Sequence, residues 1–161
     1  MLTSLFSERN LVITGLAPVA DAFSGTVTSD VVDVSEAHRL TFLVWWGVGA
    51  TGTTLITVEA CDDTSASNTS AVAFKSRRVS NHATSDVYGA VTARTSSGFT
   101  TTAGSNQLYV IEVDPAVIAA TGYRYARLKC VEQVDSPILG GILVVLSDLR
   151  VKQETPASMI D

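Results

Sequence analysis

The residues of this sequence that could support catalysis or metal binding are two histidines and a pair of aspartates. His38 and His82 have no acid or nucleophile at a catalytic spacing, and we expect both side chains to be solvated. Asp62 and Asp63 are followed by residues 64–70, which bring no further acid, whereas calcium sites need six or more oxygen ligands. The nucleophile elbow, the phosphate-binding glycine loop and the paired-histidine zinc motif are absent. We therefore expect no enzyme activity, no cofactor and no metal site.

Charge argues against a nucleic-acid partner. The formal net charge is -5, and the only basic cluster is the KSRR run at residues 75–78, which includes Arg77 and Arg78. Proteins that bind duplex nucleic acid usually present a larger basic face. We therefore expect residues 75–78 to form a solvated strand edge or loop, with a polyanion site as the less favoured alternative.

Cys61 and Cys130 are the only cysteines in the chain. Two thiols cannot form a disulfide framework, and neither has a ligand at zinc spacing. Cys130 lies on the apolar face of its predicted strand, which predicts an inert buried thiol. A bridge between the two stays open if their strands are neighbours.

Residues 107–131 have the clearest boundary signals in the sequence. They predict a strand, a short helical turn and a second strand. Asp114 suits a helix N-cap, and Pro115 suits the first helical position because its missing N–H is not needed there. Gly122 then ends the turn, since glycine enters the left-handed region without steric cost. Residues 123–131 return to alternation, with one apolar and one polar face.

Residues 40–46, LTFLVWW, are apolar on nearly every position and predict a central strand covered on both faces. Trp45 and Trp46 must then point to opposite sides, one into the core and the other to a subunit contact or under a loop. Burial of both within the domain fits equally well. Residues 53–61 follow a glycine-rich turn, and we expect them to form a long hairpin with residues 40–46.

Composition and the remaining segments indicate one domain built of strands. The 161 residues are 46% apolar and 17% charged, and Ser and Thr are abundant. No apolar run reaches the roughly 20 residues that span a membrane, and the N-terminus lacks the basic segment of a signal peptide, so we expect a soluble mature chain. Further strands are expected at residues 26–34, 71–79, 86–94 and 141–150, a short strand or arm at 11–14, and a long loop at 95–106 that is interrupted by Phe99.

The expected fold is all-β: a two-sheet antiparallel β-sandwich, jelly-roll-like, with one short helical insertion. We expect a single domain over residues 1–161. Its flexible ends are an N-terminal arm at about residues 1–10 and a C-terminal tail at about residues 152–161.

The sequence resembles the cement or decoration proteins of tailed bacteriophages, which are small accessory capsid proteins. The resemblance is carried by the apolar strand at residues 40–46, by LITVEACDD with the Ser/Thr-rich loop after it, and by VDPAVIAATGYRYARLKC. It implies a structural virion protein on the capsid exterior, assembled in the host cytoplasm, whose partners are the major capsid protein and further copies of itself. A homotrimer is favoured over a homodimer, and no nucleic acid or membrane partner is implied.

Individual contact residues do not follow from the resemblance and are hypotheses. They are Trp45, Trp46, Tyr123, Tyr125 and Phe99, with the basic Arg77 and Arg78, and the two chain ends for lattice contacts. Two other classes stay open. A tail or neck component would share the β-rich composition, and a carbohydrate-binding sandwich would use an exposed Trp or Tyr as a stacking platform.

Overall fold

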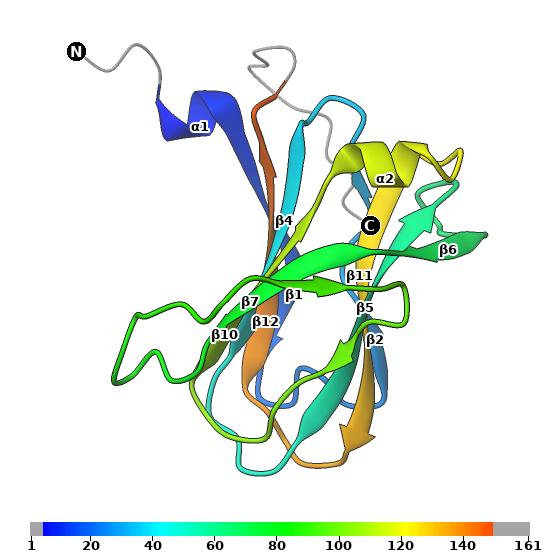
Figure 1. The fold of residues 1–161 in the computed structure, drawn as a ribbon. Coiled ribbons are helices and arrows are strands. Elements are labelled where there is room, and N and C mark those ends of the chain that lie inside the picture. Colours follow the sequence, from blue (N-terminus) through cyan, green and yellow to red (C-terminus); the bar gives the residue numbers. More distant parts are fainter. Residues whose placement is uncertain (1–4, 150–161) are drawn as a thin grey trace.

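The computed structural model describes residues 5–149, which form two antiparallel sheets packed face to face (Figure 1). Sheet A contains, in spatial order, β1 (Asn10–Val19), β12 (Gly140–Ser147), β4 (Arg39–Trp46), β10 (Gln107–Val113), β7 (Phe74–Val79) and β8 (Thr92–Arg94). Sheet B contains β2 (Thr26–Thr28), β11 (Tyr125–Val134), β5 (Thr53–Cys61) and β6 (Thr69–Val72), with β3 (Val32–Asp33) beside β11 and β9 (Phe99–Thr100) beside β5. Two very short helices, α1 (Phe6–Arg9) and α2 (Pro115–Ala119), complete the described chain.

The strands of the two sheets pair in a nested order. β1 pairs with β12, β2 with β11, β4 with β10, and β5 with β6. The first strand therefore lies beside the last and the two middle strands beside each other, which is a long hairpin rolled into two sheets, the jelly roll. The expected two-sheet sandwich is confirmed. β7, β8 and β9 come between β6 and β10 in the chain and form an insertion in this frame.

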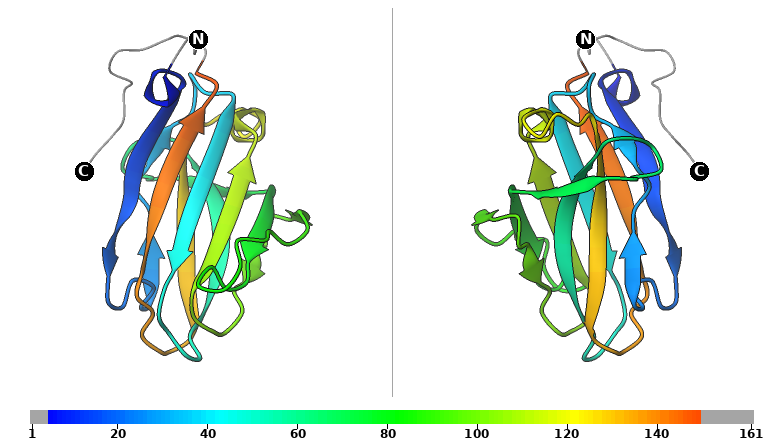
Figure 2. Two further views of the ribbon diagram at one scale, coloured as in Figure 1. Left: turned by 90° about the vertical axis from the view of Figure 1, so that its left-hand side faces the viewer. Right: turned by 90° about the vertical axis from the view of Figure 1, so that its right-hand side faces the viewer.

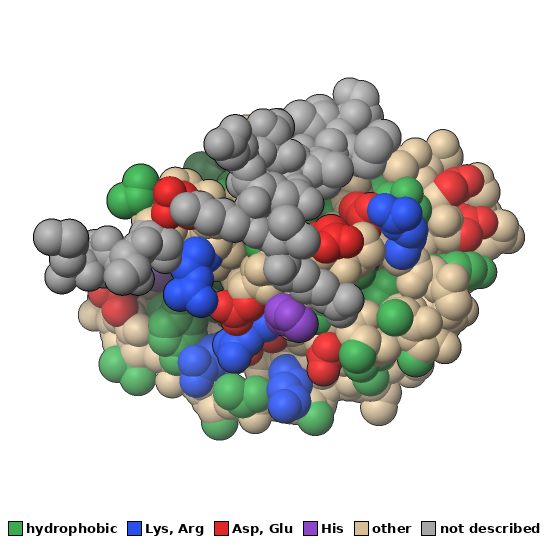
Figure 3. All heavy atoms as spheres, turned by 90° about the horizontal axis from the view of Figure 1, so that it is seen from above, with side chains coloured by type: hydrophobic (Ala, Val, Ile, Leu, Met, Phe, Trp, Pro, Cys, Tyr) green, Lys and Arg blue, Asp and Glu red, His purple; other side chains and the backbone are tan. Residues whose placement is uncertain are grey.

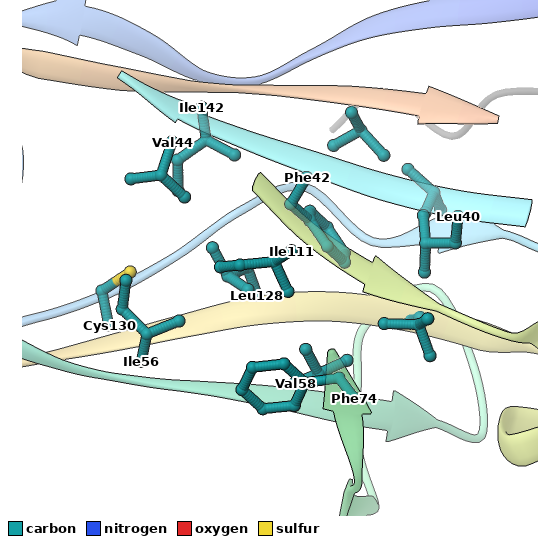
Figure 4. Close-up of a cluster of buried hydrophobic side chains, with 14 of the residues drawn as sticks. Leu40, Phe42, Val44, Ile56, Val58, Phe74, Ile111, Leu128, Cys130 and Ile142 are labelled. Atoms are coloured by element: carbon teal, nitrogen blue, oxygen red, sulfur yellow. The ribbon is translucent and has the colours of Figure 1, made fainter. Parts of the chain in front are cut away.

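The core lies between the sheets and is filled from both sides (Figure 4). Phe42 and Ile111 of sheet A and Leu128 and Ile56 of sheet B are all fully buried. Their positions alternate with outward-facing residues along each strand, because successive side chains of a strand point to opposite faces. The apolar parity of the sequence therefore marks the face that each strand turns inward.

The unit at residues 107–131 is confirmed as β10, α2 and β11. The Asp114 carboxylate accepts the backbone N–H of Ala116 at 2.9 Å, and Pro115 occupies the first turn. Gly122 follows with a φ of +86°. The helix carries the chain from sheet A to sheet B across the top of the sandwich (Figure 1), so the two flanking strands are not paired with each other.

The expected hairpin of residues 40–46 with residues 53–61 is wrong. β4 lies in sheet A between β12 and β10, whereas β5 lies in sheet B between β11 and β6. The connecting loop packs tightly on residues 136–139: a Cβ on Gly47 would lie 2.7 Å from the Leu139 carbonyl oxygen, and one on Gly52 would lie 2.6 Å from that of Ser136. The loop held against residues 136–139 carries the chain from sheet A to sheet B. β4 and β5 therefore lie in opposite sheets and do not pair edge to edge.

Other expected strands are shorter or divided in the structure. Residues 69–79 form two strands in different sheets, since β6 belongs to sheet B and β7 to sheet A. Only Thr92–Arg94 of the segment 86–94 is a strand, and residues 26–34 are split into β2 and β3. The expected loop at residues 95–106 contains β9, because Phe99 pairs with Ile56 and packs against the core.

Near its ends the described chain is more regular than expected. Residues 5–10 of the expected arm contain α1 and the start of β1, and β1 runs on to Val19. The final strand ends at Ser147, and the expected tail at residues 152–161 lies outside the described residues. Within residues 5–149, no helix is long and apolar enough to cross a membrane.

Candidate functional site

Figure 2 (left) shows sheet A from its outer side. This face is apolar in the middle of the sheet. On β4 the outward positions are Arg39, Thr41, Leu43 and Trp45, and the last two are apolar. Leu43 lies between Leu143 of β12 and Val110 of β10 in the strand register. Trp45 is 48% exposed and Leu143 is 44% exposed. The expectation that β4 is covered on both faces is therefore wrong for its outer face.

We call this surface the apolar face and define it by seven outward-facing residues from four adjacent strands. They are Val12, Leu43, Trp45, Leu108, Val110, Leu143 and Val145. None of them carries a charge, and the charged Glu112 and Lys75 stand opposite each other in the register at its edge. Large exposed apolar patches on soluble proteins usually mark interaction sites.

Sheet B presents a different outer face. Glu59 of β5 is 6% exposed, and its carboxylate accepts hydrogen bonds from Arg127 at 2.8 Å and from Lys129 at 3.2 Å. Both cations come from the neighbouring β11, where they are partly exposed. This ion-paired surface is compatible with water, whereas the described residues 5–149 leave a broad apolar area uncovered on the outer face of sheet A.

One end of the apolar face is covered by the segment between β7 and β8. The centroids of the His82 and Trp45 rings lie 4.1 Å apart. Tyr88 forms an isolated antiparallel β-bridge with Val79 of β7. His82 is half-buried, so the expectation that it is solvated is wrong. His38 is exposed, as expected. The face remains open from β1 to β4.

The two tryptophans point to opposite sides of β4, as expected. Trp46 is fully buried, stacks on Phe23 with 4.8 Å between ring centroids, and donates its indole N–H to the Gly104 carbonyl at 3.1 Å. A contact role therefore falls to Trp45, and Trp46 belongs to the core.

Tyr123 and Tyr125 lie away from the apolar face. Tyr125 is on the outer side of sheet B, with the Arg124 guanidinium 5.2 Å from its ring centroid. Tyr123 is partly buried against the core. The aromatic residues expected to make contacts are thus divided between the two sheets.

Arg77, Arg78 and Phe99 come together around a cavity of about 520 Å³. The expected loop or solvated edge at residues 75–78 is β7, and both arginines are half-buried. The sequence reasoning missed Arg94 and Tyr88, which line the same cavity. Both lie in residues 86–94, which are predicted to form a strand. The sequence pattern of this segment does not identify the strand with which it pairs.

The aspartate pair closes a loop. The Asp62 carboxylate accepts the backbone N–H of Asn68 at 2.9 Å, and the Asp63 carboxylate accepts that of Ser65 at 3.0 Å. The side-chain amide and the backbone N–H of Asn68 lower the pKa of Asp62. Within residues 5–149 no cluster of three His, Cys, Asp or Glu side chains could hold a metal ion.

The two cysteines are free and buried. Their strands are neighbours, but Cys61 stands opposite Tyr125 and Cys130 opposite Ile56. Five residues along β11 correspond to about 17 Å, at ~3.4 Å per residue. That offset rules out the bridge left open by the sequence, and the predicted burial of Cys130 is confirmed.

Comparison with known proteins adds one structural likeness. No protein-family model and no curated protein matches the chain significantly in sequence. The structure is similar to that of the SPBc2 prophage-derived protein YomS, with a TM-score of 0.43 and 13% identity over 85% of this chain and 91% of the YomS chain. At that TM-score the likeness says nothing of function.

Proposed function

We propose that this chain is a structural virion protein, a cement or decoration protein that binds the outside of a phage capsid lattice as an oligomer. The observation that carries the proposal is the apolar face. Seven outward-facing apolar residues cross four adjacent strands of sheet A, and three of them, Val12, Trp45 and Leu143, are about half exposed. Exposed apolar faces of this kind usually mark interaction sites, so the face fits a role in assembly.

We further propose that a second copy of the chain covers the apolar face. Association of two copies removes the contacting surfaces from water, and burying charged groups is costly unless each finds a partner of opposite charge. The chain has a net charge of -5, yet the apolar face has no charge within it. Copies can therefore meet there without burying charged groups, whereas a contact over the outer face of sheet B would bury Glu59, Arg127 and Lys129.

Oligomeric state tests this contact. We expect the purified protein to be a trimer, or a dimer, by size-exclusion chromatography with light scattering, and Leu143→Asp to shift it to the mass of the monomer. Burial of an unpaired carboxylate would weaken association at least tenfold, equivalent to about 1.4 kcal/mol. Val134→Asp is the matched control, because Val134 is 45% exposed at the end of a strand in sheet B. A monomeric wild type, or equal effects of the two variants, contradicts the proposal.

The lattice partner is tested separately. We expect quantitative mass spectrometry of purified particles to find a copy number close to that of the major capsid protein subunits, and soluble protein to rebind particles that lack it. A few copies per particle would place the chain in the tail or neck. Absence from particles would overturn the virion role and would turn attention to glycan binding at Trp45, the exposed tryptophan.

A further inference from the structure

The cavity beside β7 is built almost entirely by the insertion that the jelly-roll frame does not require. Its lining comes from residues 76–102, with Tyr109 of β10 as the remaining contributor. Its volume, about 520 Å³, lies within the 300–1,000 Å³ typical of small-molecule sites. Insertions on a stable frame commonly carry a binding function, because they vary without disturbing the core.

The charge of the cavity lining is unbalanced. Arg77, Arg78 and Arg94 line it, and no Asp or Glu of the described residues does so. Asp86 lies between two lining residues in the chain but is itself exposed and outside the lining. Six of the lining residues are hydroxyl-bearing serines and threonines, namely Ser76, Ser80, Ser85, Thr92, Thr100 and Thr102.

Arginines elsewhere in the described chain show the contrast. Arg39, Arg124 and Arg127 each form an ion pair with a carboxylate. Within residues 5–149 none of the three cavity arginines has such a partner. A second cavity of about 510 Å³, near α2, shares Arg94 with this one, and its lining also contains the acidic Glu112 and Asp114. That end of the sandwich shows both signs interspersed (Figure 3).

Neutral groups hold Arg94 and Arg78 in place. Arg94 donates its Nε–H to the Ser76 hydroxyl at 2.9 Å, and its guanidinium lies 4.5 Å from the centroid of the Phe99 ring. Arg78 donates to the side-chain oxygen of the buried Gln107 at 3.3 Å. These contacts orient the guanidinium groups but do not neutralise them.

Arg77 is held by an aromatic ring and is incompletely hydrogen-bonded. Its guanidinium lies 5.0 Å from the Tyr88 ring centroid, and its Nε atom is buried without a hydrogen-bond partner among the described residues. A partly desolvated cation without a counter-charge favours a nearby anion. One guanidinium group lies against each of the Tyr88 and Phe99 rings.

We propose that this cavity binds a small molecule that carries phosphate or carboxylate groups. Arginine recognises both groups by paired N–H···O hydrogen bonds, and the hydroxyl lining can accept and donate to the rest of the ligand. The volume exceeds the needs of a single inorganic ion, so the natural ligand has a body that bears the oxyanion. This inference is independent of the proposed virion role, because it concerns a single chain.

Isothermal titration calorimetry with sodium phosphate and with citrate, in turn and at constant ionic strength, tests the proposal. We expect saturable binding of one anion per chain in the millimolar range or tighter for at least one probe. Binding of phosphate alone assigns phosphate-bearing ligands, and binding of citrate alone assigns carboxylates. Absence of saturable heat with both probes overturns the proposal.

Arginine variants distinguish anion binding in the cavity from nonspecific electrostatic attraction of anions to the protein. Arg94→Gln and Arg78→Gln should each weaken binding at least tenfold, since each removes a charged donor from the cavity. Arg39→Gln is the matched control, because it removes the same charge from an exposed site paired with Asp148, and it should leave binding within twofold. Circular dichroism checks that each variant is folded, and the second cavity variant serves if the first is not. Equal weakening by the control variant would overturn the site.

Discussion

The imidazole of His82 lies on the indole of Trp45, with 4.1 Å between ring centroids and 39° between ring planes. The backbone N–H of His82 also donates to the Asn106 carbonyl at 2.7 Å, and that of Asn106 donates to the Gly47 carbonyl at 2.7 Å. These contacts connect the segment between β7 and β8 to the end of β4. The insertion that forms the arginine cavity is thereby anchored on the apolar face.

Removal of the His82 ring should loosen this anchor. We expect His82→Ala to lower the free energy of unfolding by about 0.5–1.5 kcal/mol, the usual worth of an aromatic pair. Backbone hydrogen exchange at residues 83–91 should become faster, while β4 and β10 keep their protection. His38→Ala is the control, since His38 is exposed, and it should change neither measurement. Unchanged exchange at residues 83–91 in His82→Ala would show that the ring contact does not hold the segment.

Two glycines with similar backbone angles should differ sharply when replaced. Gly25 has a φ of +65° with no atom within 4 Å of an added Cβ, whereas Gly98 has a φ of +74° and its Cβ would lie 2.0 Å from the Ile56 carbonyl oxygen. We expect Gly25→Ala to cost about 1–2 kcal/mol from backbone strain alone. Gly98→Ala should cost clearly more, because β9 must move away from β5. Urea unfolding of both variants checks this, and equal midpoints would contradict the packing of β9 on β5.

Glu59 holds two cations on the outer face of sheet B. We expect Glu59→Ala to destabilise the fold by about 1–3 kcal/mol, because Arg127 and Lys129 lose charged hydrogen bonds. Glu112→Ala, at an exposed position of β10, should change stability by about 0.5 kcal/mol or less. Chemical denaturation of the two variants measures the difference. A Glu59 variant as stable as the Glu112 variant would mean that the ion pairs contribute nothing net.

The buried thiols should be unreactive in the folded protein. Burial raises the pKa of Cys61 to about 11 and that of Cys130 to about 12, so at pH 8 almost no reactive thiolate is present. We expect iodoacetamide to label neither cysteine at pH 8 in buffer and both of them in urea, read out by mass spectrometry. Rapid labelling of Cys130 in buffer would contradict its burial.

The same two thiols give stability a pH dependence with a defined sign. In the unfolded chain they ionise near a pKa of 9.0, whereas in the folded protein they keep their protons to about pH 11. Above pH 9 the unfolded state therefore binds fewer protons than the folded state, and the free energy of unfolding falls as the pH rises. A Cys61→Ala, Cys130→Ala double variant should lose less stability than the wild type between pH 9 and pH 11. Identical pH profiles would mean that other groups set the alkaline limit.

Local features of the fold could be predicted because they depend on neighbouring residues in the chain. The cap by Asp114, the end of the turn at Gly122 and the inward parity of Ala126, Leu128 and Cys130 each follow from a few adjacent side chains. The opposite orientation of Trp45 and Trp46 follows from the two-residue period of a strand. These predictions are confirmed.

The site could be predicted only in pieces. Arg77, Arg78 and Phe99 were singled out separately, but their meeting around one cavity depends on β9 crossing to sheet B while β7 stays in sheet A. Arg94 was missed because its role depends on which strand β8 joins. The period-two pattern shows which face of a strand is apolar, but it does not identify the neighbouring strand.

The sequence by itself determined that this protein is a β-sandwich with one helical connection between strands, because alternation and turn residues act locally. Tertiary structure alone decided that β4 and β5 belong to different sheets and that β1 lies beside β12. It also decided that three arginines, none with a carboxylate partner in residues 5–149, share a cavity. Backbone hydrogen bonds are chemically the same for every partner strand, so only the packing of the whole core selects among the pairings.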